Sequence, residues 1–328
     1  MSFPVKIPLS SLAAQIGQKV DVFLCSASFE SRCRSVADYV DSTLPAKVLV
    51  CANENFPTVV SSNGEYLRSR YESQSSMVLL STDNPLKTAD SLQKAIGGVV
   101  TEAPQHYLVD ITTFTHEALL ILLRVLQLKL KTTDSLTFAY TTALEYSVGD
   151  KAEDKWLSKG IGEIRSVLGY PGKIIPTRKL HLVILAGFEG ERAERLIEEY
   201  EPSKVSLGLG DPNHSISPDH YSVNKATHQK IAAKYTDVMQ FNFSLLDPFK
   251  TKSAIEFHIR KVPGHNVLIA PMNTKISTLG VALLAFEDDS IQLCYATAHQ
   301  YNESNYSKPG SECYLFTVPG LSIPASTS

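Results

Sequence analysis

The stretch LVILAGFEGERAERLIEEY, residues 182–200, reads as a buried strand followed directly by an amphipathic helix. An uninterrupted apolar run ends in Gly187, and a Phe-Glu pair then stands where the helical spacing of apolar residues begins. This change from a continuous apolar run to a helical period predicts a strand-turn-helix unit of an α/β protein. Glu189 and Arg192 fall at the turn, so they either stabilise the start of the helix or line a site.

The same order of residues occurs earlier, in VFLCSASFESRCRSVADYV at residues 22–40. Two further stretches are echoed: residues 107–123 by 267–283, and FAYTTALEY at 138–146 by LCYATAHQY at 293–301. The offset stays at about 155–160 residues, and the order of the stretches is the same in both halves. We infer an internal duplication.

Within each half, short apolar runs alternate with longer helical patterns, which is typical of a doubly wound α/β fold. Runs without polar alternation predict parallel strands that are covered on both faces. The fold class we expect is therefore α/β, with two tandem Rossmann-like domains from the duplication, each a mostly parallel sheet with helices on both faces. A segment rich in Pro and Gly near residue 172 predicts domains at 1–172 and 173–328. The predicted strands lie at residues 20–25, 48–51, 77–80, 107–111 and 136–140, and at 180–186, 204–209, 238–243, 267–270 and 291–296.

Composition restricts the class of protein. The chain has 328 residues, is 43% hydrophobic and carries a net charge of −3, which argues against a broad nucleic-acid surface. Its five cysteines are odd in number and include no CxxC pair, as expected of reduced thiols. The pattern of the first residues does not indicate a signal peptide, and no apolar run is as long as a membrane-spanning helix requires. We expect a cytoplasmic protein.

Open parallel sheets bind ligands beyond the carboxyl ends of their strands, so polar residues in the loops at that edge are the candidate ligand contacts. After the fourth strand of the first half come Thr113 and Thr115, and the second half has Asn273, Thr274 and Lys275. Small hydroxyl residues at a strand-to-helix turn suit an anion such as phosphate, because helix N-termini present unpaired N–H groups. The alternative is that these residues only cap their helices.

The loops after the first strands hold the repeated Phe-Glu phrase. Glu30 and Glu189 could complement the helix dipole, pair with Arg32 or Arg192, or act in catalysis with Asp110. The two arginines, together with Ser28, are candidate ligand contacts, and the alternative for the arginines is pairing with neighbouring carboxylates. We expect a bond between glutamate and arginine in at least one half.

No complete catalytic motif is present in the sequence: it contains no GxGxxG after a strand, no Walker A sequence, no HExxH and no GxSxG. The histidines are scattered, and the loop that holds His214 and His220 suits solvent as well as metal. We therefore expect neither a metal site nor a cofactor.

The stretches VDITTFTHEALLILL and APMNTKISTLGVALL resemble the strand-four element of CRISPR-associated Rossmann-fold (CARF) domains. The resemblance implies that the turn faces a cyclic oligonucleotide. Asn273, Thr274 and Lys275 match the family's turn best, whereas Phe114 and His116 depart from it in the first half. Two such domains fused head to tail are similar to the SAVED architecture of bacterial anti-phage signalling, which implies a protein partner that supplies an effector.

Three functions follow as hypotheses. The preferred one is a binding subunit that senses a nucleotide or joins a defence complex. The second is a hydrolase acting on a nucleotide or nucleoside, with Glu30 or Glu189 as its acid-base group or nucleophile and Asp110 assisting. The third is a purely structural subunit.

Overall fold

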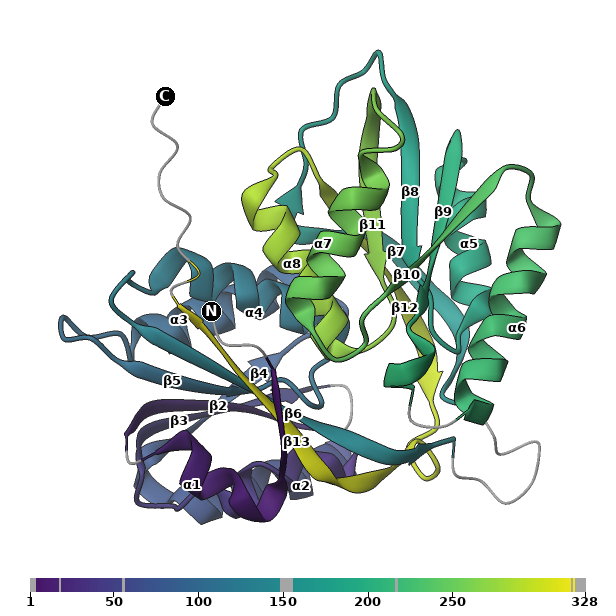
Figure 1. Cartoon of the computed structure of the whole chain (residues 1–328). Coiled ribbons are helices and arrows are strands. Elements are labelled where there is room, and N and C mark those ends of the chain that lie inside the picture. The colour runs from purple at the N-terminus through teal and green to yellow at the C-terminus, as the bar shows by residue number, and fades with distance from the viewer. Residues whose placement is uncertain are drawn as a thin grey trace. The chain divides into compact units, whose positions relative to one another are not determined.

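The computed structural model describes residues 4–17, 19–54, 57–147, 156–215, 218–319 and 321. The chain forms two compact units, each built around one sheet (Figure 1). Unit 1 comprises Met1–Val148 together with Ser307–Ser328, and unit 2 comprises Gly149–Tyr306. The end of the chain therefore returns to the unit in which the chain began.

The sheet of unit 1 has seven strands in the order β1-β13-β6-β5-β2-β3-β4. The pairs from β6 to β4 are parallel, while β13 pairs antiparallel with β6 and β1 pairs antiparallel with β13. The strand order reverses direction between β2 and β5, so the switch point of this sheet lies between their carboxyl ends. The strand bounds are β1 Val5–Pro8, β2 Val20–Ala27, β3 Pro45–Asn53, β4 Ser75–Leu80, β5 His106–Asp110, β6 Ser135–Tyr146 and β13 Ser307–Pro319.

The sheet of unit 2 has six strands in the order β10-β9-β8-β11-β12-β7. The pairs from β10 to β12 are parallel, and β7 pairs antiparallel with β12. Its switch point lies between β8 and β11, where the sheet of unit 1 has β2 and β5. The strand bounds are β7 Ser158–Pro171, β8 Lys179–Leu185, β9 Lys204–Gly210, β10 Val238–Phe243, β11 His265–Pro271 and β12 Gln292–Tyr301.

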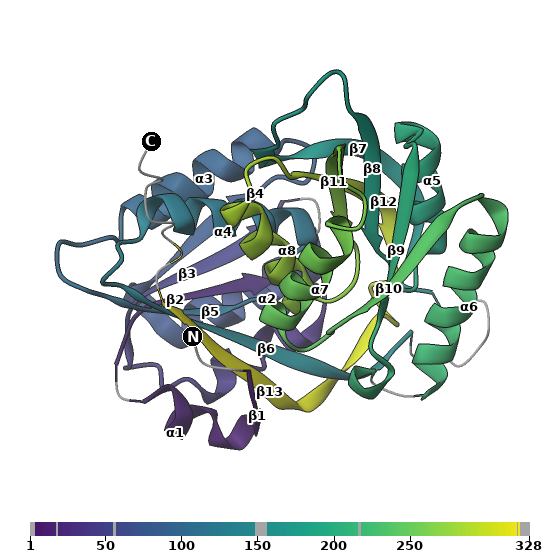
Figure 2. The same cartoon turned by 45° about the horizontal axis from the view of Figure 1, so that its top comes forward.

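The two sheets share one strand order, which agrees with an internal duplication. Each adds an antiparallel strand beside its fifth parallel strand, and these two strands are exchanged along the chain. The strand β7 follows β6 in the sequence but pairs with β12, and β13 follows β12 but pairs with β6. Figure 2 shows β13 running beside β6. Because of this exchange, the compact units do not follow the expected boundaries of 1–172 and 173–328: β7 lies before residue 172 but belongs to unit 2.

Helices cover both faces of each sheet (Figure 1). In unit 1, α2 packs against β2 and β3 through Val60, Leu67 and Tyr71, while α4 is buried over most of its length. In unit 2, α5 and α6 pack on one face through Leu196 and Ile231. The helix bounds are α1 Leu12–Ile16, α2 Pro57–Tyr71, α3 Pro85–Gly97, α4 His116–Lys129, α5 Gly190–Tyr200, α6 Pro218–Lys234, α7 Pro248–Ile259 and α8 Lys275–Glu287.

One expected helix is different. Residues 31–40 form two short 3-10 helices, η2 Ser31–Arg34 and η3 Ala37–Tyr39, where unit 2 has the full α-helix α5. Val36 and Val40 are buried, as their helical spacing indicates. Arg70 of α2 donates hydrogen bonds to the carbonyls of Ala37, Asp38 and Val40. These carbonyls lie in the last turn of the segment, where a helix has no N–H partners of its own to offer, so Arg70 caps the end of the segment.

The expected strands are confirmed, and so is the fold class of two Rossmann-like α/β domains with mostly parallel sheets. Strands β1, β7 and β13 were not predicted. Among the described residues, no helix is long and apolar enough to cross a membrane.

Candidate functional site

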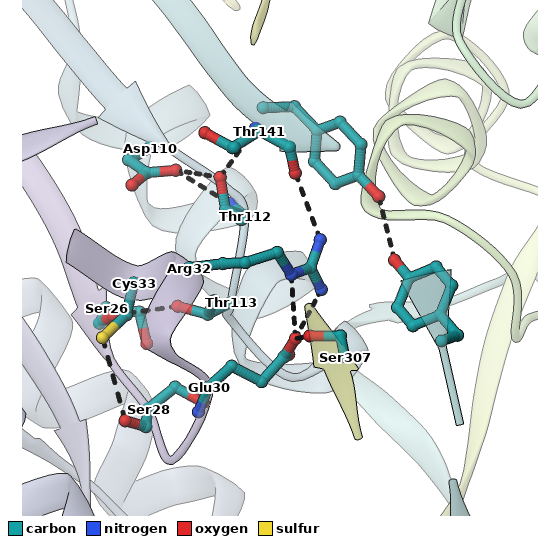
Figure 3. Close-up of polar contacts among 12 residues, drawn as sticks. Ser26, Ser28, Glu30, Arg32, Cys33, Asp110, Thr112, Thr113, Thr141 and Ser307 are labelled. Atoms are coloured by element: carbon teal, nitrogen blue, oxygen red, sulfur yellow. Dashed lines mark hydrogen bonds and ion pairs between the residues drawn. The ribbon is translucent and has the colours of Figure 1, made fainter. Parts of the chain in front are cut away.

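In unit 1 the loop after β2 is held by an ion pair between Glu30 and Arg32. Arg32 Nη2 lies 2.5 Å from Glu30 Oε2, and Arg32 Nε donates to the same oxygen at 2.9 Å. The two side chains are 9% and 3% exposed, so the pair is almost fully removed from water. Arg32 Nη1 also donates to the Thr141 carbonyl of β6 at 3.1 Å (Figure 3). The arginine thus joins the loop to the fifth parallel strand.

The exchanged strand joins this pair through its first residue. Ser307 Oγ, at the start of β13, donates to Glu30 Oε2 at 2.6 Å. The Arg32 guanidinium lies 5.2 Å from the centre of the Tyr146 ring, and the Tyr146 and Tyr140 hydroxyls are 3.5 Å apart. Glu30 Oε2 therefore accepts hydrogen bonds from Arg32, two positions away in the same loop, and from Ser307 of β13, 277 positions away.

Unit 2 contains the same arrangement. Glu189 pairs with Arg192, and Arg192 Nη2 donates to the Ala296 carbonyl of β12. Ser158, the first residue of β7, donates to Glu189. We call these two sets the Glu–Arg–Ser clusters: Glu30, Arg32 and Ser307 in unit 1, and Glu189, Arg192 and Ser158 in unit 2.

Tyrosine rings lie beside both arginines, although the ring that contacts the guanidinium is not the equivalent one in the two units. The Arg192 guanidinium lies 5.3 Å from the centre of the Tyr295 ring. Tyr140 and Tyr146 of β6 correspond in the repeat to Tyr295 and Tyr301 of β12. Burial raises the pKa of both Tyr140 and Tyr301 well above the ordinary tyrosine value, so these phenols stay neutral. Cation–π contact adds to the attraction that holds each arginine.

The glutamates do not act as helix caps. Glu30 and Glu189 occupy the N-cap positions of η2 and α5, but neither side chain makes a capping hydrogen bond. Each carboxylate is directed to its arginine instead. Burial opposes the charge of Arg32, but the Glu30 carboxylate outweighs that effect and holds the arginine pKa well above its ordinary value. The expected bond between glutamate and arginine is therefore confirmed in both halves.

The threonine and asparagine residues of the fourth-strand loops also have internal partners. Thr113 Oγ1 donates to the Ser26 carbonyl at 2.9 Å, and Asn273 Nδ2 donates to the Ala186 carbonyl at 2.7 Å. These equivalent bonds span the two switch points, from β5 to β2 and from β11 to β8. Thr115 caps α4 by accepting from the Ala118 N–H, so its hydroxyl has the capping role that is the alternative to ligand contact.

The second-half turn lies at the start of α8. Thr274 caps this helix by accepting from the Ser277 N–H at 3.1 Å, and it donates to the Leu245 carbonyl at 2.9 Å. Lys275 is the first residue of α8 and is half-buried. The structure thus places a lysine at the N-terminus of a 13-residue helix, beside a backbone whose N–H groups favour anions.

Ser28 and Asp110 lie deeper in unit 1. Ser28 is 8% exposed, and its Oγ accepts from the Glu30 N–H at 3.3 Å. Asp110 is 2% exposed and accepts from both the N–H and the hydroxyl of Thr112. Burial raises the pKa of Asp110 from 3.8 to about 7, although the Thr112 bonds and the Arg32 charge act in the opposite direction. Asp110 therefore titrates near neutral pH inside the core.

Several residues of this edge were missed by sequence reasoning. Thr112 links Asp110 to β6, because its hydroxyl accepts from the Thr141 N–H at 3.0 Å. Ser158 and Ser307 were missed because the strands they begin were not predicted. The repeated tyrosines in residues 138–146 and 293–301 were a signal in the sequence that was not connected with the two arginines.

Metal ligation receives no support from the described part of the chain, where no group of three or more His, Cys, Asp or Glu side chains could hold an ion. His214 hydrogen-bonds Ser244 at 3.1 Å, and the His220 ring packs edge-on against Phe188. The arrangement at both sheet edges is thus one of ion pairs, hydroxyl groups and helix N-termini.

Comparison with known proteins identifies no family for this chain. No family model and no curated protein matches the sequence. Among solved structures, the cytoplasmic domain of a prokaryotic cation chloride cotransporter is 10% identical, with a TM-score of 0.26 over 87% of this chain and 99% of that one. The pyocyanin biosynthetic protein PhzM is 11% identical, with a TM-score of 0.24 over 44% of this chain and 38% of that one. The N-domain of a bacterial malonyl-CoA reductase with NADP is 10% identical, with a TM-score of 0.23 over 81% of this chain and 76% of that one.

Proposed function

We propose that this protein is a cytoplasmic binding subunit that senses a nucleotide and passes the signal to a partner protein that carries the effector. The observation that carries the proposal is the use of both loop glutamates inside the Glu–Arg–Ser clusters. With these carboxylates paired to arginine, the fourth-strand turns offer hydroxyl groups, helix N-termini and the basic side chain of Lys275. Such groups suit an anionic ligand better than acid-base chemistry.

The turn at Asn273, Thr274 and Lys275 supplies the ligand contact in this proposal. It follows β11 at the switch point of unit 2, where open α/β sheets bind their ligands. Its resemblance to the CARF turn points to a cyclic oligonucleotide, and the tandem arrangement points to a SAVED-like role in bacterial anti-phage defence. The biological setting comes from that resemblance alone.

The hydrolase hypothesis requires a carboxylate that can take or give a proton or attack a substrate. Glu30 accepts from Arg32 and from Ser307, and Glu189 accepts from Arg192 and from Ser158. A carboxylate held by arginine is a weak base and a weak nucleophile. The clusters therefore favour a binding subunit over an enzyme that uses these glutamates.

The proposal is tested by native mass spectrometry of protein from its own host, followed by calorimetry with a panel of cyclic and linear nucleotides. A co-purifying nucleotide, or binding of one member of the panel, supports the proposal. The Lys275→Ala variant should then bind that nucleotide more weakly by roughly 1.5–3 kcal/mol, the range for a hydrogen bond to a charged group. Lys230→Ala, at an exposed lysine of α6 in the same unit, is the matched control and should bind normally.

The melting temperature of Lys275→Ala should stay close to that of the wild type, which separates lost binding from lost folding. Absence of heat with every nucleotide, and a host preparation without nucleotide, would instead support the purely structural subunit.

A further inference from the structure

Arg32 is one of the candidate ligand contacts of unit 1, but its guanidinium is committed to Glu30 and the Thr141 carbonyl. The next arginine in the loop, Arg34, is held in a different way. Arg34 Nε donates to Asn63 Oδ1 at 2.8 Å, and the guanidinium stacks 4.2 Å from the centre of the Tyr66 ring. Neither partner carries a charge, so the position of Arg34 is fixed without its charge being neutralised.

The support beneath Arg34 is buried and continuous with the switch-point loop. Asn63 of α2 is 5% exposed, and its Nδ2 donates to the Ser28 carbonyl at 2.5 Å. The Ser28 carbonyl also accepts from the Cys33 thiol. The guanidinium is therefore tied through one amide to the loop that follows β2, at the carboxyl edge of the sheet.

The remaining donors of Arg34 are unused. Within the described ranges, Arg34 has no ion-pair partner, and its Nη1 and Nη2 groups make no hydrogen bond. The carboxylate of Asp38, four positions further along the chain, accepts from the Tyr66 hydroxyl at 2.6 Å. The other arginines of this region differ: Arg32 is paired with Glu30, and Arg70 donates to three backbone carbonyls.

Arg34 is half-buried, its Nε is bonded to Asn63, and one face of its guanidinium lies on the Tyr66 ring. Its Nη1 and Nη2 groups are therefore available to a ligand. That edge presents paired N–H donors whose geometry matches the oxygens of a phosphate group. Stacking on an aromatic ring and a bond to a buried amide reduce the entropy lost when a ligand binds. We propose that Arg34 is the phosphate-binding residue of unit 1, positioned by Asn63 and Tyr66, and that it takes a phosphate group of a small-molecule ligand.

This inference deepens the proposed function, because a nucleotide carries the phosphate that Arg34 would bind. It places the contact on unit 1, in a loop other than the Lys275 turn of unit 2. Phosphate binding by Arg34 and nucleotide sensing through the Lys275 turn can therefore be tested separately.

The test is calorimetry of the full chain with inorganic phosphate as the probe, at constant ionic strength maintained with chloride. Arg34→Gln should weaken phosphate binding tenfold or more. Arg34→Lys should weaken it as well, because lysine keeps the charge but loses the paired donors and the Nε bond to Asn63. Arg68→Gln changes the net charge equally at an exposed site on α2 and should bind phosphate like the wild type. Circular dichroism and melting temperature check that each variant is folded.

Equal phosphate affinity in the wild type, Arg34→Gln and Arg68→Gln would overturn the inference, and so would a wild-type chain that binds no phosphate. If a nucleotide binds with full affinity to Arg34→Gln, the Arg34 site is wrong and the nucleotide-sensing function stands. If phosphate binding depends on Arg34 but no nucleotide binds, the site stands and the nucleotide-sensing function is wrong.

Discussion

The Ser307 hydroxyl donates a hydrogen bond to Glu30 Oε2 at 2.6 Å, although the two residues are 277 positions apart in the chain. The equivalent bond from Ser158 to Glu189 spans 31 positions. In both units the serine is the first residue of the exchanged strand, and the glutamate belongs to the loop after the first parallel strand. The glutamate of each repeated Phe-Glu pair therefore hydrogen-bonds the exchanged strand of its unit, β13 in unit 1 and β7 in unit 2.

The exchange makes a prediction about fragments. Residues 149–306 contain every strand of the unit 2 sheet, so this fragment should fold and unfold cooperatively. Residues 173–328 lack β7, which leaves the β12 edge uncovered and removes Ser158 from the Glu189 cluster. Circular dichroism with urea titration of both fragments checks this. A stable 173–328 fragment together with an unfolded 149–306 fragment would mean that the sheet does not need β7.

Asp110 predicts a loss of stability as the pH rises. Its folded pKa of about 7 lies above the ordinary value of 3.8, so the folded protein binds more protons than the unfolded chain between these limits. The free energy of unfolding should therefore fall as the pH rises from about 4 to 7. Asp110→Asn keeps the acceptor for Thr112 and cannot ionise, so it should be more stable than the wild type at pH 8, by up to roughly 4 kcal/mol.

Urea unfolding of Asp110→Asn and wild type at pH 5 and pH 8 measures this difference. The exposed Asp90→Asn variant, on α3 of the same unit, controls for the change in net charge. A stability difference that is the same at both pH values would show that Asp110 does not titrate in this range.

Unit 2 contains two buried histidines, His181 and His258, and the first of them predicts that stability falls as the pH drops. Ser206 Oγ lies 2.7 Å from His181 Nε2 and 2.8 Å from His258 Nε2, while the Nδ1 atom of each ring has no hydrogen-bond partner in the described structure. Burial, with the nearby His258, His265 and Lys204, lowers the pKa of His181 from 6.5 to about 4. The unfolded chain binds more protons in that window, so stability should fall as the pH drops from about 6.5 to 4.

His181→Gln removes one such group and should reduce the slope of stability against pH by up to about 1.4 kcal/mol per pH unit. Denaturant unfolding at pH 7, 6, 5 and 4.5 supplies the slopes, and His299→Gln, at an exposed histidine, is the control. Equal slopes for all three proteins would contradict the account of His181.

Much of the fold could be predicted because parallel strands such as β2 and β8 are continuous apolar runs, and α5 follows a helical period in which Leu196 and Ile197 are buried. The exchanged strands could not: β7 contains Gly160, Gly162 and Gly169 and is only partly buried, so its apolar pattern is weak. Consecutive strands usually pair with each other, so β7 would be expected beside β6 and β13 beside β12. The observed pairing of β7 with β12 and of β13 with β6 is not specified by local sequence.

In the Glu–Arg–Ser clusters, too, the local contacts could be predicted and the long-range contacts could not. The pairing of Glu30 with Arg32 and of Glu189 with Arg192 followed from short spacing and repetition. The contributions of Ser307, the Thr141 carbonyl and Asn63 depend on long-range packing. Sequence spacing also could not indicate that Arg32 would be neutralised while Arg34 would not, because both arginines stand in the same short turn.

The claim that the repeated Phe-Glu phrase forms a structural ion pair is tested most directly by a double-mutant cycle on Glu30 and Arg32. Glu30→Gln, Arg32→Met and the double variant are compared by urea unfolding, with the exposed Glu145 and Lys308 pair as the control cycle. Glu30→Gln alone should cost about 3 kcal/mol, because it leaves a buried arginine without its counter-charge. The Glu30–Arg32 coupling energy should exceed about 1.5 kcal/mol, whereas the control coupling should stay below about 1 kcal/mol. Additive effects at Glu30 and Arg32, within about 0.5 kcal/mol, would contradict the account.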